Sequence, residues 1–284
     1  MNRELETLTM SAVDLPTIPV VATKVIELIE QEDVTIEKLA AAVSSDPAVA
    51  ARILKLSNSA YYGCQRQINT LSAAIMLLGF KTLKSLVIAA SLKQLSRRFG
   101  LTEKMLWEHS VGAALAGRII ASQGKFINEE TGFLVGLFHD LGKTIMNNHD
   151  PQKFQGVMMR CYNEGHPFAE VERSVYPYSH AEVGALVIRK WNFPESLSTA
   201  IMYHHQFSSA PITDQYDLFL TATASLANKF CKKLGIGDRD SDEELDLAHS
   251  PEAMLLGYTP DTVEKAVETF RETFEENKSF FLND

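Results

Sequence analysis

The sequence predicts an all-α protein, a multi-helix bundle, and three observations lead to that prediction. Asp46, Asp150 and Thr259 each stand directly before a proline, an arrangement that caps and opens helices. Apolar residues recur at helical spacing along much of the chain. Alternating apolar and polar runs joined by Asn-Gly or Asp-Gly turns, which would indicate hairpins, are missing. Helices joined by loops therefore account for the whole pattern.

Amphipathic stripes predict helices in the early, middle and late parts of the chain. Ser179 and Glu182 have the spacing of a capping box, which places His180 at a helix N-terminus. The stripes that follow the start signals are Val21, Val25, Leu28 and Ile29; Val49, Ile53 and Leu56; Val183, Leu186 and Val187; and Val263, Val267, Phe270 and Phe274.

One stretch, GIGDRDSDEELD at residues 235–246, breaks the helical pattern and is expected to be an acidic loop. A softer boundary near residues 97–101 separates the helices on either side. We therefore expect an N-terminal helical subdomain over residues 1–100, a second helical subdomain over 101–234, and an acidic loop with a helical appendage over 235–284.

The amino-acid composition argues against nucleic-acid-binding, membrane-spanning and exported proteins. The 284 residues include 27 Lys and Arg against 36 Asp and Glu, a net charge of −9, which argues against a nucleic-acid binder held by phosphate contacts. The longest apolar runs, near 73–80 and 86–90, fall short of the roughly 20 residues that span a bilayer. Glu4 and Glu6 stand where an export signal needs a basic start. With three cysteines in no paired pattern, we expect a cytoplasmic protein with reduced thiols.

The residues that suggest chemistry are histidines. Five of the eight lie in a spaced series, at intervals of 30, 41 and 24 residues, and one of them precedes Asp140. Each interval accommodates a helix, a turn and a return, so the series fits convergence from different helices on one point in a bundle. Imidazole and carboxylate without thiolate suit Fe, Mn, Ni, Co or Zn and disfavour a structural zinc knot. The alternative is that each histidine is a hydrogen-bonded core residue, with His204 and His205 at a solvated helix end.

The stretch GLFHDLGK, residues 136–143, resembles the signature of the HD superfamily of metal-dependent phosphohydrolases. The stretches at residues 15–29, 44–63 and 68–91 resemble the start of HDOD proteins, the HD-related output-domain family of bacterial signalling. The resemblance covers roughly residues 14–230. It implies an N-terminal helical subdomain packed on an HD-like helical bundle, a metal pocket in the C-terminal half, and a regulatory output role.

The resemblance also implies a ligand set for one or two divalent transition metals, with Asp140 as the bridge between them. If hydrolysis occurs, Asp140 would act through the metals and Lys143 would contact a phosphate. The alternative for Lys143 is a solvated residue that interacts with carbonyl groups near a helix end. The implied metal ligands are His109, His139, Asp140, His180, His204 and His205.

The chain departs from the pattern at two positions. Asn228 stands where the HD pattern has a late aspartate, which leaves one metal with a neutral, weaker ligand or with none at this position. Gln206 and Phe207 follow the His-His pair, without the glutamate or the Gly-Tyr-Pro element of the HD-GYP phosphodiesterases, so recognition of a cyclic dinucleotide is not supported.

Three functions remain open at this point. The first is a signal-transduction output protein with a retained metal centre and little or no catalysis, and this is the function we expect. The second is a metal-dependent phosphohydrolase or phosphodiesterase acting on a nucleotide or cyclic dinucleotide. The third is a di-iron redox or gas sensor. The expected partner is a signalling protein or a small phosphate-containing ligand, with no membrane or nucleic acid, and the oligomeric state is open.

Overall fold

A computed structural model describes residues 16–59, 62, 67–95, 100–166 and 168–282. Within these ranges the chain forms helices joined by loops and contains no strand, which confirms the predicted all-α class. Some features of the sequence lie outside the described residues, namely Glu4, Glu6, Cys64 and the boundary residues 97–99.

The contacts divide the chain into two compact units. The smaller unit contains Thr17–Leu95 and Glu272–Asp284, and the larger contains Met1–Pro16 and Ser96–Arg271. The three-part division expected from the sequence, with boundaries at residues 100 and 234, stays a prediction.

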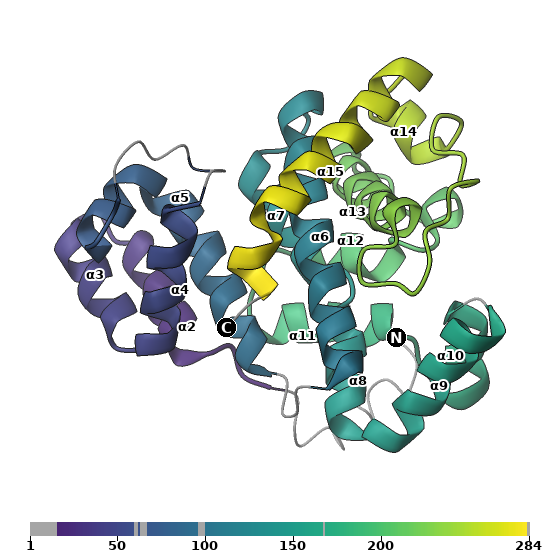
Figure 1. Cartoon of the computed structure of the whole chain (residues 1–284), viewed down its shortest axis with the longest axis horizontal. Helices are drawn as coiled ribbons and strands as arrows, with labels where there is room; N and C mark the ends of the chain where they lie inside the picture. Colours follow the sequence, from purple (N-terminus) through teal and green to yellow (C-terminus); the bar gives the residue numbers. More distant parts are fainter. Residues whose placement is uncertain (1–15, 60–61, 63–66, 96–99, 167, 283–284) are drawn as a thin grey trace. The chain divides into compact units, whose positions relative to one another are not determined.

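The smaller unit is a bundle of helices that follow one another closely in the sequence (Figure 1). Its helices are α2 (Val20–Ile29), α3 (Ile36–Ser44), α4 (Pro47–Ser57) and α5 (Leu71–Leu92).

The larger unit is built around α6, which packs along α7 and α13 (Figure 1). Its helices are α6 (Leu101–Gly124), α7 (Glu129–Phe138), α8 (Leu141–His149), α9 (Pro151–Glu164), α10 (Phe168–Val175), α11 (His180–Lys190), α12 (Glu195–Tyr203), α13 (Gln215–Leu234) and α14 (Pro251–Leu255), followed by α15 (Pro260–Leu282), whose last residues belong to the smaller unit.

The helix starts predicted from the sequence are confirmed. Asp46 accepts hydrogen bonds from the first amides of α4, at 3.0 and 3.1 Å, and Asp150 accepts one from the first turn of α9 at 3.0 Å. Ser179 and Glu182 form the predicted capping box, so His180 is the first residue of α11. Residues 235–250 form no helix, as expected for the acidic loop.

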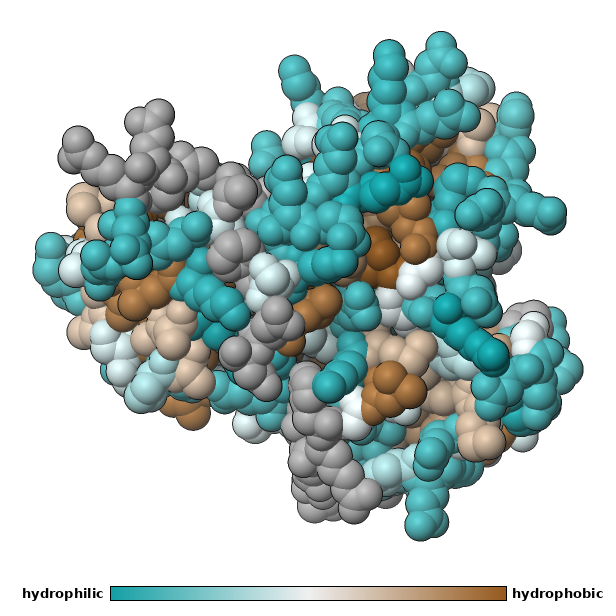
Figure 2. All heavy atoms as spheres, viewed as in Figure 1, coloured by the Kyte–Doolittle hydropathy of each residue, from teal (hydrophilic) through white to brown (hydrophobic). Residues whose placement is uncertain are grey.

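Helix α5 is a core helix of the smaller unit. By length and composition Leu71–Leu95 is long enough and apolar enough to cross a membrane, but 61% of its apolar 18-residue stretch is buried inside the protein. Gly79, at φ 72°, also interrupts the helix. The two short apolar runs in the sequence are thus parts of one longer buried segment. On the face drawn in Figure 2, hydrophilic side chains predominate and the described apolar residues form no continuous belt.

Candidate metal centre

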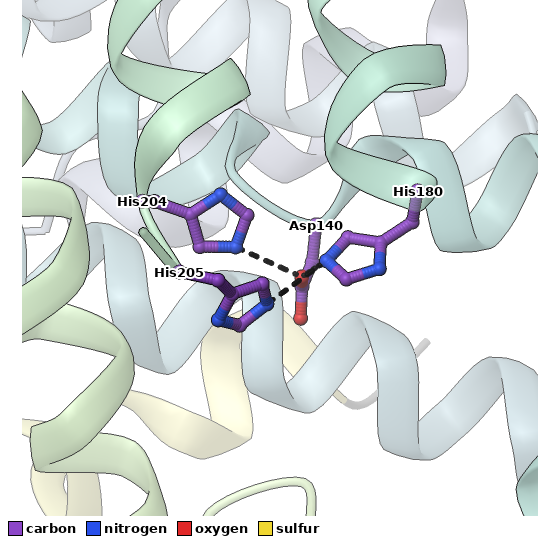
Figure 3. Close-up of side chains that lie close together, drawn as sticks. All are labelled: Asp140, His180, His204 and His205. Atoms are coloured by element: carbon purple, nitrogen blue, oxygen red, sulfur yellow. Dashed lines mark hydrogen bonds and ion pairs between the residues drawn. The ribbon is translucent and has the colours of Figure 1, made fainter. Parts of the chain in front are cut away.

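The six predicted ligands come from four places in the larger unit, namely α6, the junction of α7 and α8, the start of α11 and the end of α12, and they gather around Asp140. Two groups of side chains have their ligand atoms within 4.8 Å of one another, and both groups contain Asp140. One group is Asp140, His180, His204 and His205, which point toward one another in Figure 3, and the other is His109, His139 and Asp140.

The histidines of the two groups face different oxygens of the Asp140 carboxylate, so each group with its oxygen forms one half of the cluster. Oδ1 of Asp140 lies 3.2 Å from Nε2 of His180 and 3.7 Å from Nε2 of His204. Oδ2 lies 3.4 Å from Nε2 of both His109 and His139. This is the arrangement of a bridging carboxylate between two sets of imidazoles.

The protein sets the orientation of four of these rings through their other nitrogen. In each ring Nδ1 lies near an oxygen that only accepts hydrogen bonds, so Nδ1 carries the proton and Nε2 presents its lone pair to the cluster in the neutral ring. These contacts are His109 with the Ile236 carbonyl at 3.0 Å, His139 with the Gly136 carbonyl at 2.7 Å, His204 with the Ile201 carbonyl at 2.6 Å, and His180 with the Glu172 carboxylate at 2.8 Å.

The electrostatics of the cluster favour neutral imidazoles around an ionised carboxylate. Burial lowers the pKa of His109 to about 3 and that of His204 to about 4. Burial alone would raise the pKa of Asp140, but His139 and Lys143 beside it hold that pKa well below its ordinary value. His180 differs, because burial lowers its pKa but the carboxylates of Glu172 and Asp140 together more than offset that effect, so its pKa is raised.

Two buried atoms in the cluster lack a hydrogen-bond partner. They are Oδ1 of Asp140 and Nε2 of His204, both of which point into the group of four side chains. A buried, unsatisfied acceptor is costly unless an ion or a donor completes it. Nitrogen lone pairs beside a carboxylate oxygen suit a divalent transition metal. The residues present therefore fit a metal ion at this position.

Two glycines of the GLFHDLGK stretch bring the ligand-bearing helices together. A Cβ on Gly136 would lie 2.0 Å from the carbonyl oxygen of Ala113, so only glycine lets α7 approach α6 this closely. A Cβ on Gly142 would lie 1.9 Å from the carbonyl oxygen of His180, at the contact between α8 and α11. His139 and Asp140, between these glycines, are thereby placed against both helices.

Lys143 and Asn228, which the sequence analysis singled out, both contact the cluster. Lys143 donates a hydrogen bond to Oδ2 of Asp140 at 2.7 Å, and its side chain is only 12% exposed. Asn228 is buried in α13, with its amide oxygen 3.0 Å from Nε2 of His109.

The cluster opens to solvent at His205, its exposed member. A cavity of about 460 Å³ adjoins it. Its lining includes His205, Ser208, Ser209, Lys229, Lys232 and Asp242. A small polar ligand has room to reach the His204–His205 side of the cluster.

Sequence reasoning missed Glu172 and the two glycines. Glu172 is fully buried in α10, and both of its oxygens lie within 3.1 Å of Nδ1 of His180. A glutamate amid the charged residues of a short amphipathic helix carries no signal of this role. The spacing of Gly136 and Gly142 around the His-Asp pair was a usable signal, because conspicuous small residues mark close helix contacts.

Comparisons with known proteins agree with this architecture. Residues 15–207 match the family model of the HDOD domain. The chain is 25% identical over 217 residues to an uncharacterized protein of Treponema pallidum (strain Nichols), a match that covers 76% of this chain and 42% of that protein. The chain thus spans less than half the length of this relative.

Solved structures share the fold. An HDOD domain protein of unknown function from Geobacter sulfurreducens is 25% identical, with a TM-score of 0.80 over 98% of this chain and 96% of that one. A Shewanella amazonensis SB2B protein provisionally named a phosphohydrolase is 21% identical, with a TM-score of 0.73 over 96% of both chains. A Marinobacter aquaeolei VT8 protein provisionally named a signal transduction protein is 18% identical, with a TM-score of 0.70 over 100% of this chain and 62% of that one. On the match of its first two thirds to the family model, the chain belongs to the HDOD domain family.

Proposed function

We propose that this chain is a regulatory output protein of bacterial signal transduction, acting in the cytoplasm, whose His/Asp cluster binds divalent transition metal with little or no catalysis. The observation that carries the metal-binding part is the convergence of Nε2 lone pairs on Asp140, with each of four rings fixed through Nδ1. The Marinobacter protein, which is named for signal transduction, supports the signalling part only by its shared fold.

Two contacts support weak or absent catalysis. Lys143, which the HD pattern would direct to a phosphate, is bound to Asp140 instead. Asn228 supplies a neutral amide at His109, where the pattern has a carboxylate. A partner protein would then bind differently to the metal-loaded and metal-free forms. The cavity at His205 would admit a small phosphate-containing ligand.

A second candidate is a metal-dependent phosphohydrolase. It is favoured by the two ligand groups that share one carboxylate, because paired metals commonly cleave phosphate esters. Bound metal would supply Lewis-acid activation of water and of the phosphoryl group. The His and Asp side chains would hold the ions, and the cavity at His205 would admit the ester.

The test is metal content by mass spectrometry on untagged protein purified without chelators, followed by a panel of nucleotides and cyclic dinucleotides. We expect bound Fe, Mn, Ni, Co or Zn in the wild-type protein and its loss in His204→Ala, with helicity by circular dichroism unchanged. His249→Ala is the matched control, since His249 is exposed, pairs with Asp246 and belongs to neither ligand group. Absence of metal after incubation with each ion would refute the proposal.

Turnover in the nucleotide panel, lost in His204→Ala and kept in His249→Ala, would favour the phosphohydrolase. Iron with a redox-dependent spectrum would favour the di-iron sensor. Bound metal without turnover is the result expected of a regulatory centre.

A further inference from the structure

The two halves of the cluster are not equivalent, because only one of them already holds a cation supplied by the protein. Around Oδ1 of Asp140 stand the imidazoles of His180 and His204, and Oδ1 accepts no hydrogen bond. Around Oδ2 stand the imidazoles of His109 and His139, and Oδ2 accepts a hydrogen bond from an ammonium group.

That ammonium group belongs to Lys143 and is held from several sides. Its Nζ lies 2.7 Å from Oδ2 of Asp140 and 4.2 Å from the centre of the Phe168 ring. The backbone amide of Lys143 donates to the Asp140 carbonyl at 2.9 Å, which keeps the two residues in one turn. An ammonium group between a carboxylate and an aromatic face is stabilised by both. The cation is therefore a built part of this half.

Asn228 completes the same half with a neutral group. The Ile236 carbonyl, 3.0 Å from Nδ1, keeps the proton of His109 on that nitrogen, so Nε2 is an acceptor. Oδ1 of Asn228 lies 3.0 Å from this nitrogen, and a half-turn of the amide would present its NH₂ group to the lone pair instead. Asn228 thus brings a polar side chain without negative charge to this half of the cluster.

The charges balance in this half without a second metal ion. It contains two imidazoles, one amide, one shared carboxylate and one ammonium group. A divalent ion against Oδ2 would stand beside the Lys143 ammonium in a buried site, where like charges repel strongly. An aspartate at position 228 would offset part of that repulsion, and the chain has an amide there.

We propose that the centre is a one-metal centre, in which the ion lies with Asp140 Oδ1, His180, His204 and His205, and the Lys143 ammonium takes the place of the second cation beside Oδ2. This inference rests on the proposed metal binding. It assigns Lys143 a positioning role, because the ammonium group orients the carboxylate of Asp140 and neutralises its Oδ2 atom.

The test counts Mn²⁺ per chain on the 284-residue chain, stripped of metal and then reloaded. The variants are Lys143→Met, Asn228→Asp and the double variant, and Lys153→Met is the control because Lys153 lies over the Tyr176 ring, 4.4 Å from its centre, and outside the cluster. We expect about one Mn²⁺ in the wild type and the control, and about two in the double variant. Each single variant should tighten the second site about tenfold.

Electron paramagnetic resonance gives a second readout that does not depend on activity. An isolated Mn²⁺ gives a resolved hyperfine spectrum, and two ions bridged by Asp140 give an exchange-coupled one, which we expect only when the second site is created. If Lys143→Met lowers the helical signal in circular dichroism, Lys143→Gln replaces it, since glutamine keeps a polar group without the charge.

Three results would overturn the inference, and they differ in whether they also refute the proposed metal binding. About two ions in the wild-type protein would refute the role of Lys143 and leave the proposed metal binding intact. About one ion in the double variant would do the same. No bound ion in any variant would refute both the inference and the proposed function.

Discussion

Replacing Gly142 with alanine tests whether α8 and α11 meet as closely as the metal centre requires. The added Cβ would lie 1.9 Å from the carbonyl oxygen of His180 and 2.9 Å from the amide nitrogen of Gly184, whereas real Cβ contacts essentially never fall below 3.0 Å. Both atoms belong to the α11 backbone, so no side chain can rotate away. The two helices must separate by about 1 Å.

The expected cost has two opposing parts. Alanine favours a helix over glycine by about 1 kcal/mol, and overpacking of this kind costs about 1–3 kcal/mol or more. Because the clashing atoms are backbone, the upper part of that range applies, and we expect net destabilisation of about 1–2 kcal/mol, or a Tm lower by about 2–8 °C. A shift of about 1 Å between Asp140 and His180 also exceeds the roughly 0.2 Å tolerance of metal–ligand distances, so metal affinity should fall at least about tenfold.

Chemical denaturation, thermal unfolding and metal titration measure these effects. Gly156→Ala is the matched control, because Gly156 is an exposed position in α9 and a Cβ there would have nothing within 4 Å. The control should gain up to about 1 kcal/mol and bind metal like the wild type. Equal stability and metal affinity in the two alanine variants would refute the close contact of α8 with α11.

Three further outcomes are expected. Glu172→Gln should lower metal affinity about 10- to 100-fold by removing the carboxylate that orients His180, with helicity by circular dichroism retained, and unchanged affinity would contradict that role. Burial alone would raise the pKa of Glu252, but hydrogen bonds from Lys229 and Ser225 lower this pKa below its ordinary value. The ionised carboxylate therefore stabilises the fold at pH values above the ordinary pKa, and the stabilisation is lost as the pH falls through the lowered pKa. Denaturation against pH should show a smaller acid-induced loss in Glu252→Gln than in the wild type, and identical profiles would count against the pairing. Chelation should lower the Tm of metal-loaded protein and readdition should restore it, because a ligand that binds only the folded state stabilises it.

Local sequence signals were enough to predict the helical class and several helix starts. The cap of α4 at Asp46 and the box of Ser179 with Glu182 depend on residues within one turn, so their geometry is written in the adjacent sequence. The apolar stripes predicted burial well for the same reason, and Val49, Ile53 and Phe270 are fully buried.

The identity of the clustered side chains was also within reach of the sequence, but their pairing was not. Spacing and resemblance singled out His109, the His139–Asp140 pair and His180, and these side chains do meet in the structure. Which oxygen of Asp140 faces which imidazole depends on helix packing across as many as 95 residues, from His109 to His204. No local pattern encodes that choice.

The sequence by itself determined the all-α class, a spaced series of histidines, and an asparagine at position 228 where the HD pattern, by resemblance, has an aspartate. Only the tertiary structure decided that Glu172 orients His180, that Asn228 meets His109, and that Lys143 binds the Oδ2 atom of Asp140. The reason is physical: capping and amphipathic burial are local and strong, whereas these polar contacts join helices distant in sequence and are fixed by close packing, as at Gly142.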